Sequence, residues 1–194
     1  MISIRPSGAL TRRQSQLETA LVRVVLAEGF AHLTVDELAE RLGCSKRTLY
    51  ALAPSKEQLV TRTVRLFFRE AAEQVEDSIR RTRSPARRLT GYLEAVAEAL
   101  APASRAFLAD VAAFAPAAEI YELNTQLATE RVRELISEGI ASRAFRDVPA
   151  LFVAEVVAST MRRIGTGELQ RATGLSDAEA YSQLAEVAVA ALRR

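Results

Sequence analysis

TVDELAERLGCSKRTLY, residues 34–50, is the stretch that decides the fold, because it carries the start and stop signals of two short helices. Thr34 and Glu37 have the spacing of a capping box, in which a hydroxyl and a carboxylate satisfy free backbone amides at a helix start. Apolar side chains follow along one face, and Gly43 permits a left-handed turn after them. Ser45 then caps a second short helix. This order predicts a helix-turn-helix.

The second of these helices presents Lys46, Arg47 and Thr48 at its N-terminal end. That end enters the major groove of DNA in helix-turn-helix proteins, where cations and hydroxyls can contact base edges or phosphates. The free amides at the two helix starts, at Thr34 and Ser45, can also bind a phosphate. The pattern favours DNA recognition over the alternative of two ordinary amphipathic helices joined by a glycine turn.

The charges are concentrated where such a role requires them. Residues 1–56 hold eight Lys and Arg against five Asp and Glu, whereas the rest of the chain holds 18 against 19. Between Arg41 and Lys56 there are four cations and no acid. A basic segment on a nearly neutral body is typical of a head that contacts phosphates.

The same stretch resembles a known family. Residues 34–50, the SKEQL of residues 55–59 and the upstream AEGF of residues 27–30 are similar to the signature of the TetR family of transcriptional regulators. The resemblance is dense over residues 17–59, and beyond them it concerns the number and length of the helices. It implies a DNA-binding head on a helical body that binds a small molecule and dimerises.

The resemblance also implies roles for individual residues of the turn and the second helix. Thr34 would contact the DNA backbone. Lys46 and Arg47 would face the major groove, and Thr48 would contact a base or a phosphate. These assignments predict that the second helix is the recognition helix.

Around this helix the resemblance implies further phosphate contacts and two departures. Tyr50 and Lys56 would each bind a phosphate, and Leu49 would lie in the core of the head. Leu52 stands where the family often has a histidine or tyrosine that contacts phosphate, so that contact would be missing. Ala53 replaces a frequent phenylalanine, so the packing between helices must be filled by other side chains.

Along the whole chain, helix start and stop signals predict an all-α protein of about nine helices, and no alternating strand pattern occurs. We expect the helix-turn-helix domain over residues 1–56 and a linking helix over residues 56–81. Ser84-Pro85 is a good helix start and marks the boundary to an effector-binding and dimerisation body over residues 84–194. Residues 165–175 are expected to form a loop.

The body is expected to hold a pocket for a small effector. Bulky apolar side chains at helical spacing can form pocket walls, although such residues can equally be simple core. The candidate wall residues carry few charges, so they favour an apolar or aromatic effector. They are Tyr92, Phe107, Phe114, Tyr121 and Met161. An effector with different affinities for two arrangements of the heads would release a repressor from a palindromic operator.

A homodimer is expected from the last two long helices. Residues 151–164 are apolar over more than one face, and a helix that is apolar all round must be covered on every side. Pairing with twofold mates in a four-helix bundle would cover both helices and place two heads on one operator. The alternative is that both helices lie inside one subunit. The predicted interface is Val153, Val157, Met161, Leu184, Ala188 and Leu192.

The sequence does not contain the residues that an enzyme or a metal site needs. It has no phosphate-binding glycine loop, no HExxH and no nucleophile elbow. His32 is the only histidine and stands in a connecting loop, and Cys44 is the only cysteine and is expected to fill the turn. The sequence therefore predicts a protein that is not an enzyme and that has no cofactor and no metal.

The remaining classes are a membrane protein and a helical adaptor. No apolar run approaches the roughly 18 residues of a membrane span, and the N-terminus lacks a signal-peptide pattern, so we expect a cytoplasmic protein. An α-helical protein–protein adaptor that binds no DNA stays open on composition. Replacing Lys46 and Arg47 with alanine distinguishes the two functions, because only a DNA-binding protein would lose its operator.

Overall fold

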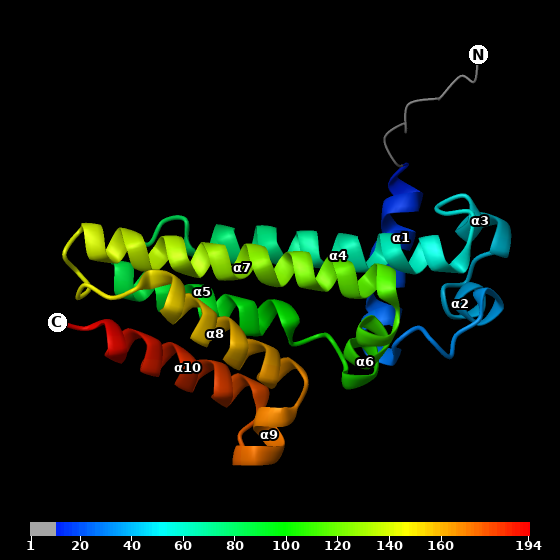
Figure 1. The fold of residues 1–194 in the computed structure, drawn as a ribbon. Coiled ribbons are helices and arrows are strands. Elements are labelled where there is room, and N and C mark those ends of the chain that lie inside the picture. The colour runs from blue at the N-terminus through cyan, green and yellow to red at the C-terminus, as the bar shows by residue number, and fades with distance from the viewer. Residues whose placement is uncertain (1–10) are drawn as a thin grey trace.

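The computed structural model describes residues 11–194, and this part of the chain is built from helices alone (Figure 1). Residues 1–10 lie outside the described part. They are the first residues of the expected head and belong to the N-terminal stretch that was considered for a signal peptide. The predicted all-α class is confirmed, with one helix more than the nine expected. The helices are α1 (Arg12–Glu28), α2 (Val35–Arg41), α3 (Lys46–Tyr50), α4 (Lys56–Ile79), α5 (Pro85–Leu100), α6 (Arg105–Ala113), α7 (Ala115–Ala141), α8 (Ala150–Gly165), α9 (Glu168–Thr173) and α10 (Asp177–Leu192). Within residues 11–194, no helix is both long and apolar enough to cross a lipid bilayer.

Side-chain caps begin the helices of the head at the predicted residues. The Thr34 hydroxyl accepts a hydrogen bond from the backbone of Glu37 at 3.2 Å, and the Glu37 carboxylate accepts one from the backbone of Thr34 at 2.7 Å. These bonds lower the pKa of Glu37. At the start of α4, Ser55 and Gln58 have the spacing of a capping box, and one of its two hydrogen bonds forms. The Ser55 hydroxyl accepts from the backbone of Gln58 at 3.2 Å, and no return bond from Gln58 occurs in the described residues.

Glycines determine the structure of two segments of the body, and one of these segments differs from the sequence-based expectation. The expected loop over residues 165–175 contains α9, which lies between Gly167 and Gly174, both in the left-handed region at φ 70° and 78°. Gly139 lies inside α7, although a glycine more often marks the end of a helix. A β-carbon there would be 2.1 Å from the ring of Phe145, so this glycine makes room for a buried aromatic side chain.

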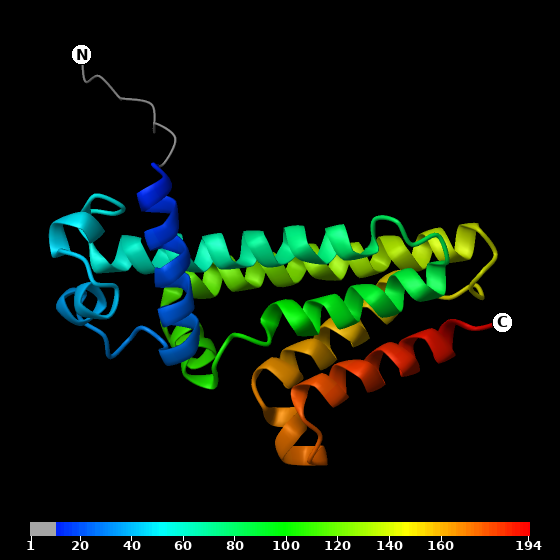
Figure 2. The same ribbon diagram turned by 180° about the vertical axis from the view of Figure 1, so that it is seen from behind.

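The helices form a head and an elongated body that share one long helix. Helices α1, α2 and α3 lie together at one end of the molecule (Figure 1). Helix α4 starts among them and runs along the body beside α7, while α5, α8 and α10 pack below (Figures 1 and 2). The C-terminus lies at the end of the body away from the head. Any change in the direction of α4 therefore acts on the head directly.

Buried apolar side chains form two clusters along this length. One cluster surrounds the head and includes Leu38 and Leu49, both fully buried, together with Phe107 of α6. The other fills the body between α5, α7 and α10, around Leu93 and Ile136. Burying a leucine side chain contributes about 1.5–3 kcal/mol, so each cluster is a substantial source of stability. The predicted core position of Leu49 is confirmed.

Helix α6 joins the head to the body through one carboxylate and three aromatic rings. Asp110 accepts hydrogen bonds from the backbone amides of Phe30 at 2.6 Å and Ala31 at 2.8 Å, in the link between α1 and α2. The ring of Phe30 packs edge-on against Phe107 and Phe114, with centroids 6.3 and 5.9 Å away. This junction fixes the start of the helix-turn-helix on the body.

Candidate nucleic-acid interface and ligand cavity

The turn between α2 and α3 is a compact left-handed connection. Gly43 has φ 59°, and a β-carbon built on it meets nothing within 4 Å. Backbone conformation, and not lack of space, is therefore what favours glycine there. The backbone of Cys44 donates to Ala39 at 2.9 Å, which closes the turn onto α2. The predicted helix-turn-helix is present.

Helix α3 presents the predicted DNA contacts on its outer face. Ser45, Lys46 and Arg47 are exposed, and Tyr50 is 47 % exposed, while Leu49 is buried beneath them. This burial fixes the helix on the head and leaves its first turn open to solvent. The first turn is the part that reads DNA in helix-turn-helix proteins.

Several of the predicted contacts already have partners inside the protein. The Lys46 ammonium lies 2.5 Å from the Asp36 carboxylate, in an exposed pair that contributes at most about 1 kcal/mol. The Lys56 ammonium donates to the Ala31 carbonyl at 3.1 Å. Arg47 has no carboxylate within 4.0 Å in the described residues. Of the three cations predicted to contact DNA, it is the one without a hydrogen bond or ion pair in the described residues.

Hydroxyl groups of the head are also engaged. The Thr34 hydroxyl donates to Glu37 at 2.8 Å, within the capping box. The hydroxyls of Ser45 and Thr48 lie 2.9 Å apart, and Thr48 is half-buried. A phosphate would have to compete with these bonds for a hydroxyl group. The backbone amides of Val35 and Asp36, and of Lys46 and Arg47, have no acceptor within their helices and need no such exchange.

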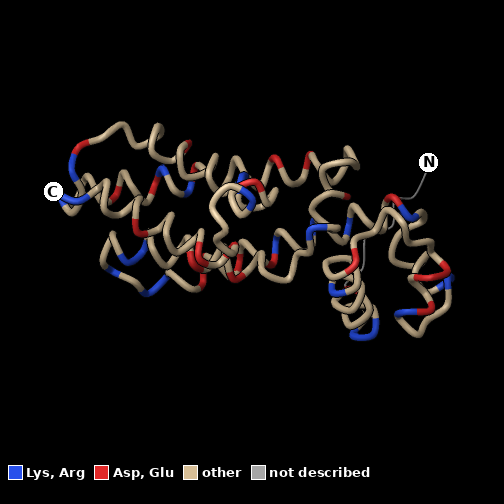
Figure 3. The backbone as a smooth tube through the Cα atoms, turned by 90° about the horizontal axis from the view of Figure 1, so that it is seen from below, with Lys and Arg blue, Asp and Glu red and all other residues tan. Residues whose placement is uncertain are grey.

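The fold places acids beside the basic segment that the sequence pattern singled out. Charges of both signs occur in the head (Figure 3), because α2 carries Asp36, Glu37 and Glu40, and Asp36 pairs with Lys46 of α3. The count of four cations and no acid between Arg41 and Lys56 therefore overstates the positive field of this segment. Local contacts by individual cations are the better guide to a DNA-binding surface.

The two residues that depart from the family pattern are buried, and the single cysteine is half-buried. Leu52 and Ala53 are both buried in the cluster of the head. Cys44 is half-buried in the turn, and burial raises the pKa of its thiol. His32 is exposed in the link before α2. Among the described residues, no group of three or more histidine, cysteine or acidic side chains could hold a metal ion.

A cavity of about 580 Å³ lies in the body between α4, α5, α7, α8 and α10. Three of the predicted wall residues line it: Tyr92, Tyr121 and Met161. Phe107 and Phe114 do not line it, because they pack around Phe30 at the junction of α6 with the head. Their helical spacing marked them as buried but could not indicate which cluster they join.

Tyrosine hydroxyls are among the neutral polar groups of this cavity. Tyr92 and Tyr181 are only 5 % and 4 % exposed, their hydroxyls make no hydrogen bond in the described residues, and neither oxygen is sealed off from the cavity. Burial raises the pKa of both tyrosines, so they stay protonated and can donate. Tyr181 was missed in the sequence because the last helix was assigned to the dimer interface.

The predicted dimer residues lie largely inside the subunit, which corrects the expected interface. Val157, Leu184, Ala188 and Leu192 are buried in the core of the body, Val153 is half-buried and Met161 lines the cavity. The large apolar residues that α8 and α10 expose are different ones: Leu151, Phe152, Val156 and Val187. A helix that is apolar on several faces does not reveal from sequence which face packs inward.

Comparison with known proteins gives the head and the fold independent context. Residues 19–63 match the sequence profile of the bacterial regulatory proteins of the tetR family. An uncharacterised HTH-type transcriptional regulator of Bacillus subtilis, YvaF, is 46 % identical over 57 residues, which is 29 % of this chain and 29 % of that protein. The profile match covers most of α1, the helix-turn-helix and the start of α4.

The likeness in structure extends over almost the whole chain. A TetR transcription regulator from Haloarcula marismortui superposes with a TM-score of 0.79 at 18 % identity, covering 94 % of this chain and 98 % of that one. A putative transcriptional regulator from Saccharomonospora viridis, solved in complex with choline, gives 0.77 at 14 % identity with the same coverage. The adaptor alternative receives no support from these comparisons.

Proposed function

Because this chain belongs to the TetR family of transcriptional regulators, we propose that it is a repressor that binds a palindromic operator as a homodimer and is released by a small-molecule effector. It would act in the cytoplasm, in contact with the chromosome. The observation that carries the proposal is the exposed first turn of α3, held on the head by buried Leu49, with Arg47 free of internal partners.

The proposed DNA contacts divide into base contacts and phosphate contacts. Arg47 is placed to reach base edges, where a bidentate arginine–guanine pair contributes about 1–3 kcal/mol of discrimination. Lys46, Tyr50 and Lys56 would bind phosphates that position α3 in the groove. Thr34, Ser45 and Thr48 would add contacts from the helix starts, mainly through backbone amides.

Selection of bound sequences from a randomised duplex library, at near-physiological salt, tests the DNA-binding function. We expect an inverted repeat with half-sites about one helical turn apart. Arg47→Ala should weaken binding to that repeat at least tenfold. Arg83→Ala is the matched control, because Arg83 is exposed at the end of the body away from the head and should leave binding unchanged. No enrichment by folded protein, or equal effects of the two variants, would refute the function.

For the dimer, we propose that a second copy of the chain covers the exposed apolar side chains of α8 and α10. Phe152 and Val156 of α8, with Val187 of α10, would meet their twofold mates in a four-helix bundle. Phe152→Glu should yield a monomer in sedimentation equilibrium at micromolar concentration. Leu123→Glu changes an exposed leucine of α7 and should leave the dimer intact. A monomeric wild-type protein would contradict this part of the proposal.

The cavity is the proposed effector site. Its volume lies within the range of about 300–1,000 Å³ that is usual for small-molecule sites, and apolar side chains dominate its lining. The structural neighbour with choline binds a small molecule on a similar fold. An apolar or aromatic effector that fills the cavity would favour one direction of α4 over another and so change the spacing of the two heads.

A further inference from the structure

Three polar side chains gather where α8 ends at the cavity. Arg162, Tyr121 and Tyr181 all line it. The Tyr121 hydroxyl reaches the last turn of α8, since a β-carbon built on Gly165 would lie 3.6 Å from it. Burial raises the pKa of Tyr121, and the charge of Arg162 acts in the opposite direction with a smaller effect. Burial also raises the pKa of Tyr181, with a smaller contribution from Tyr121, so the three groups are electrostatic neighbours.

Of the two arginines that line the cavity, Arg162 is the one that lacks a counter-charge in the described residues. It is half-buried, and in residues 11–194 no carboxylate oxygen lies within 4.0 Å of its guanidinium. Glu98 of the lining is exposed to solvent, and the other charges of the lining are paired. Arg131 lies 2.8 Å from Glu76, and Asp177 lies 2.8 Å from Arg105. A half-buried guanidinium with no partner has lost part of its hydration without compensation.

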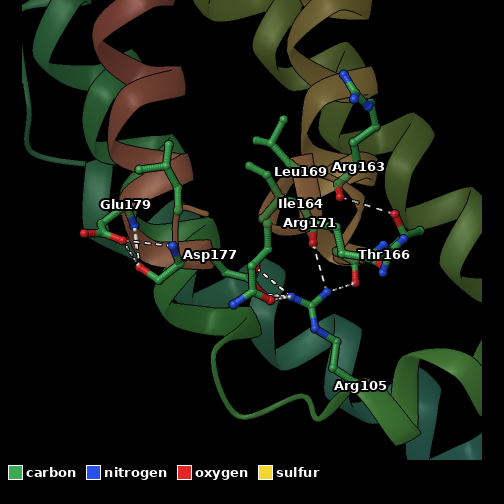
Figure 4. A network of polar contacts seen from close by, with 12 residues as sticks. Arg105, Arg163, Ile164, Thr166, Leu169, Arg171, Asp177 and Glu179 are labelled. Atoms are coloured by element: carbon green, nitrogen blue, oxygen red, sulfur yellow. Dashed lines mark hydrogen bonds and ion pairs between the residues drawn. The ribbon is translucent and has the colours of Figure 1, made fainter. Parts of the chain in front are cut away.

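Asp177 cannot act as the counter-ion of Arg162, because it is already paired with Arg105. Arg105 reaches from α6 into the gap between the end of α8 and the start of α10 (Figure 4). It donates to the carbonyls of Ile164 at 3.1 Å and Gly165 at 3.0 Å, and to both carboxylate oxygens of Asp177. Asp177 is therefore neutralised by a fixed neighbour.

Acids outside the cavity are poor partners for Arg162 as well. Its outer side borders a shallow surface pocket that Glu122, Glu130 and Glu155 also line. Glu130 is paired with Arg133, and Glu122 and Glu155 lie in solvent. An exposed ion pair contributes only about 0–1 kcal/mol. A carboxylate held inside the cavity, away from water, would interact with the same guanidinium more strongly.

Most of the side chains that line the cavity are apolar, which suits a hydrocarbon body. Val75 of α4, Val96 of α5 and Val132 of α7 line it. We propose that the effector is a monocarboxylic acid with an apolar body, whose carboxylate is bound by Arg162 and the hydroxyls of Tyr121 and Tyr181. This inference rests on the proposed effector function of the cavity and narrows its ligand class.

Probes that share one body and differ in the head group test the ligand class. Isothermal titration calorimetry on the full chain would compare decanoate, 1-decanol and decyltrimethylammonium, each below its micelle concentration. The pair 2-naphthoate and 2-naphthol repeats the comparison on a flat body, in case the cavity does not accept an alkyl chain. We expect the carboxylate of at least one body to bind at least tenfold more tightly than the partner compounds with that body.

Substitutions then assign the effect to the guanidinium. Arg162→Gln should weaken carboxylate binding by between about tenfold and a hundredfold and leave the alcohol unchanged. Arg163→Gln is the matched control. Arg163 is the next residue in the chain, but its side chain is exposed and is paired with Glu168 at 2.9 Å. Tyr181→Phe removes only a hydroxyl and should weaken the carboxylate several-fold. Thermal melting followed by circular dichroism confirms that each variant is folded.

The outcomes separate this inference from the proposed function. If the alcohol or the ammonium compound binds as tightly as the acid, or if Arg162→Gln weakens acid and alcohol equally, the carboxylate class is wrong while the cavity remains an effector site. If no probe of either body binds, the ligand class and the effector part of the proposed function both fail. Operator selection tests the DNA-binding part independently of either result.

Discussion

Removal of the Asp110 carboxylate should loosen the head from the body. One oxygen of Asp110 accepts both the Phe30 amide, at 2.6 Å, and the Ala31 amide, at 2.8 Å. Asp110→Ala leaves both donors without their acceptor. The Ala31 amide is exposed and can donate to water instead. The Phe30 amide is partly buried, so its lost hydrogen bond is not replaced by water. A buried donor left unsatisfied costs about 1–3 kcal/mol.

We therefore expect Asp110→Ala to lower the free energy of unfolding by about 2–3 kcal/mol. Asp110→Asn keeps an oxygen acceptor of the same size and should cost only about 1 kcal/mol, the difference between a charged and a neutral acceptor. Urea unfolding followed by circular dichroism measures both variants. Asp147→Ala is the control, because Asp147 is exposed and makes no hydrogen bond in the described residues. A loss for Asp110→Ala within about 0.5 kcal/mol of that control would refute the reasoning.

Three further predictions concern the head and its turns. Leu49→Ala should cost about 2–5 kcal/mol in urea unfolding because the side chain is fully buried, whereas exposed Leu123→Ala should stay within about 0.5 kcal/mol of wild type. Gly29→Ala should lower the melting temperature more than Gly174→Ala. Both glycines have positive φ, but only a β-carbon at Gly29 meets a neighbour, 2.6 Å from Asp110, so equal losses would contradict the crowding argument. Burial raises the pKa of Cys44, so iodoacetamide at pH 8 should alkylate it several-fold more slowly in the folded than in the urea-unfolded protein, as mass spectrometry would record.

The head could be predicted from sequence because its signals are local. A capping box needs only Thr34 and Glu37, three residues apart, and a left-handed turn needs only Gly43. The buried position of Leu49 was implied by the resemblance of this short stretch to the TetR family. No long-range information is required for any of these features, and the structure has each of them.

The body could be predicted only in outline, because its details depend on contacts between distant residues. Phe107 and Tyr121 have similar apolar surroundings in the sequence, yet one joins the junction with Phe30 and the other lines the cavity. Arg162 carries no sequence signal of its own. Its lack of a counter-charge is visible only in the structure. There, the acids near Arg162 are either exposed or paired with another arginine, and Asp177 is paired with Arg105.

The placement of the aromatic phenols has a practical consequence. The chain has four tyrosines and no tryptophan. Tyr50 lies on the exposed face of α3, and Tyr92, Tyr121 and Tyr181 line the cavity. Every tyrosine is therefore at a proposed binding surface. Incorporation of 3-fluorotyrosine would give four ¹⁹F resonances, one from the head and three from the cavity, so a single spectrum would report operator and effector binding separately and without an attached dye.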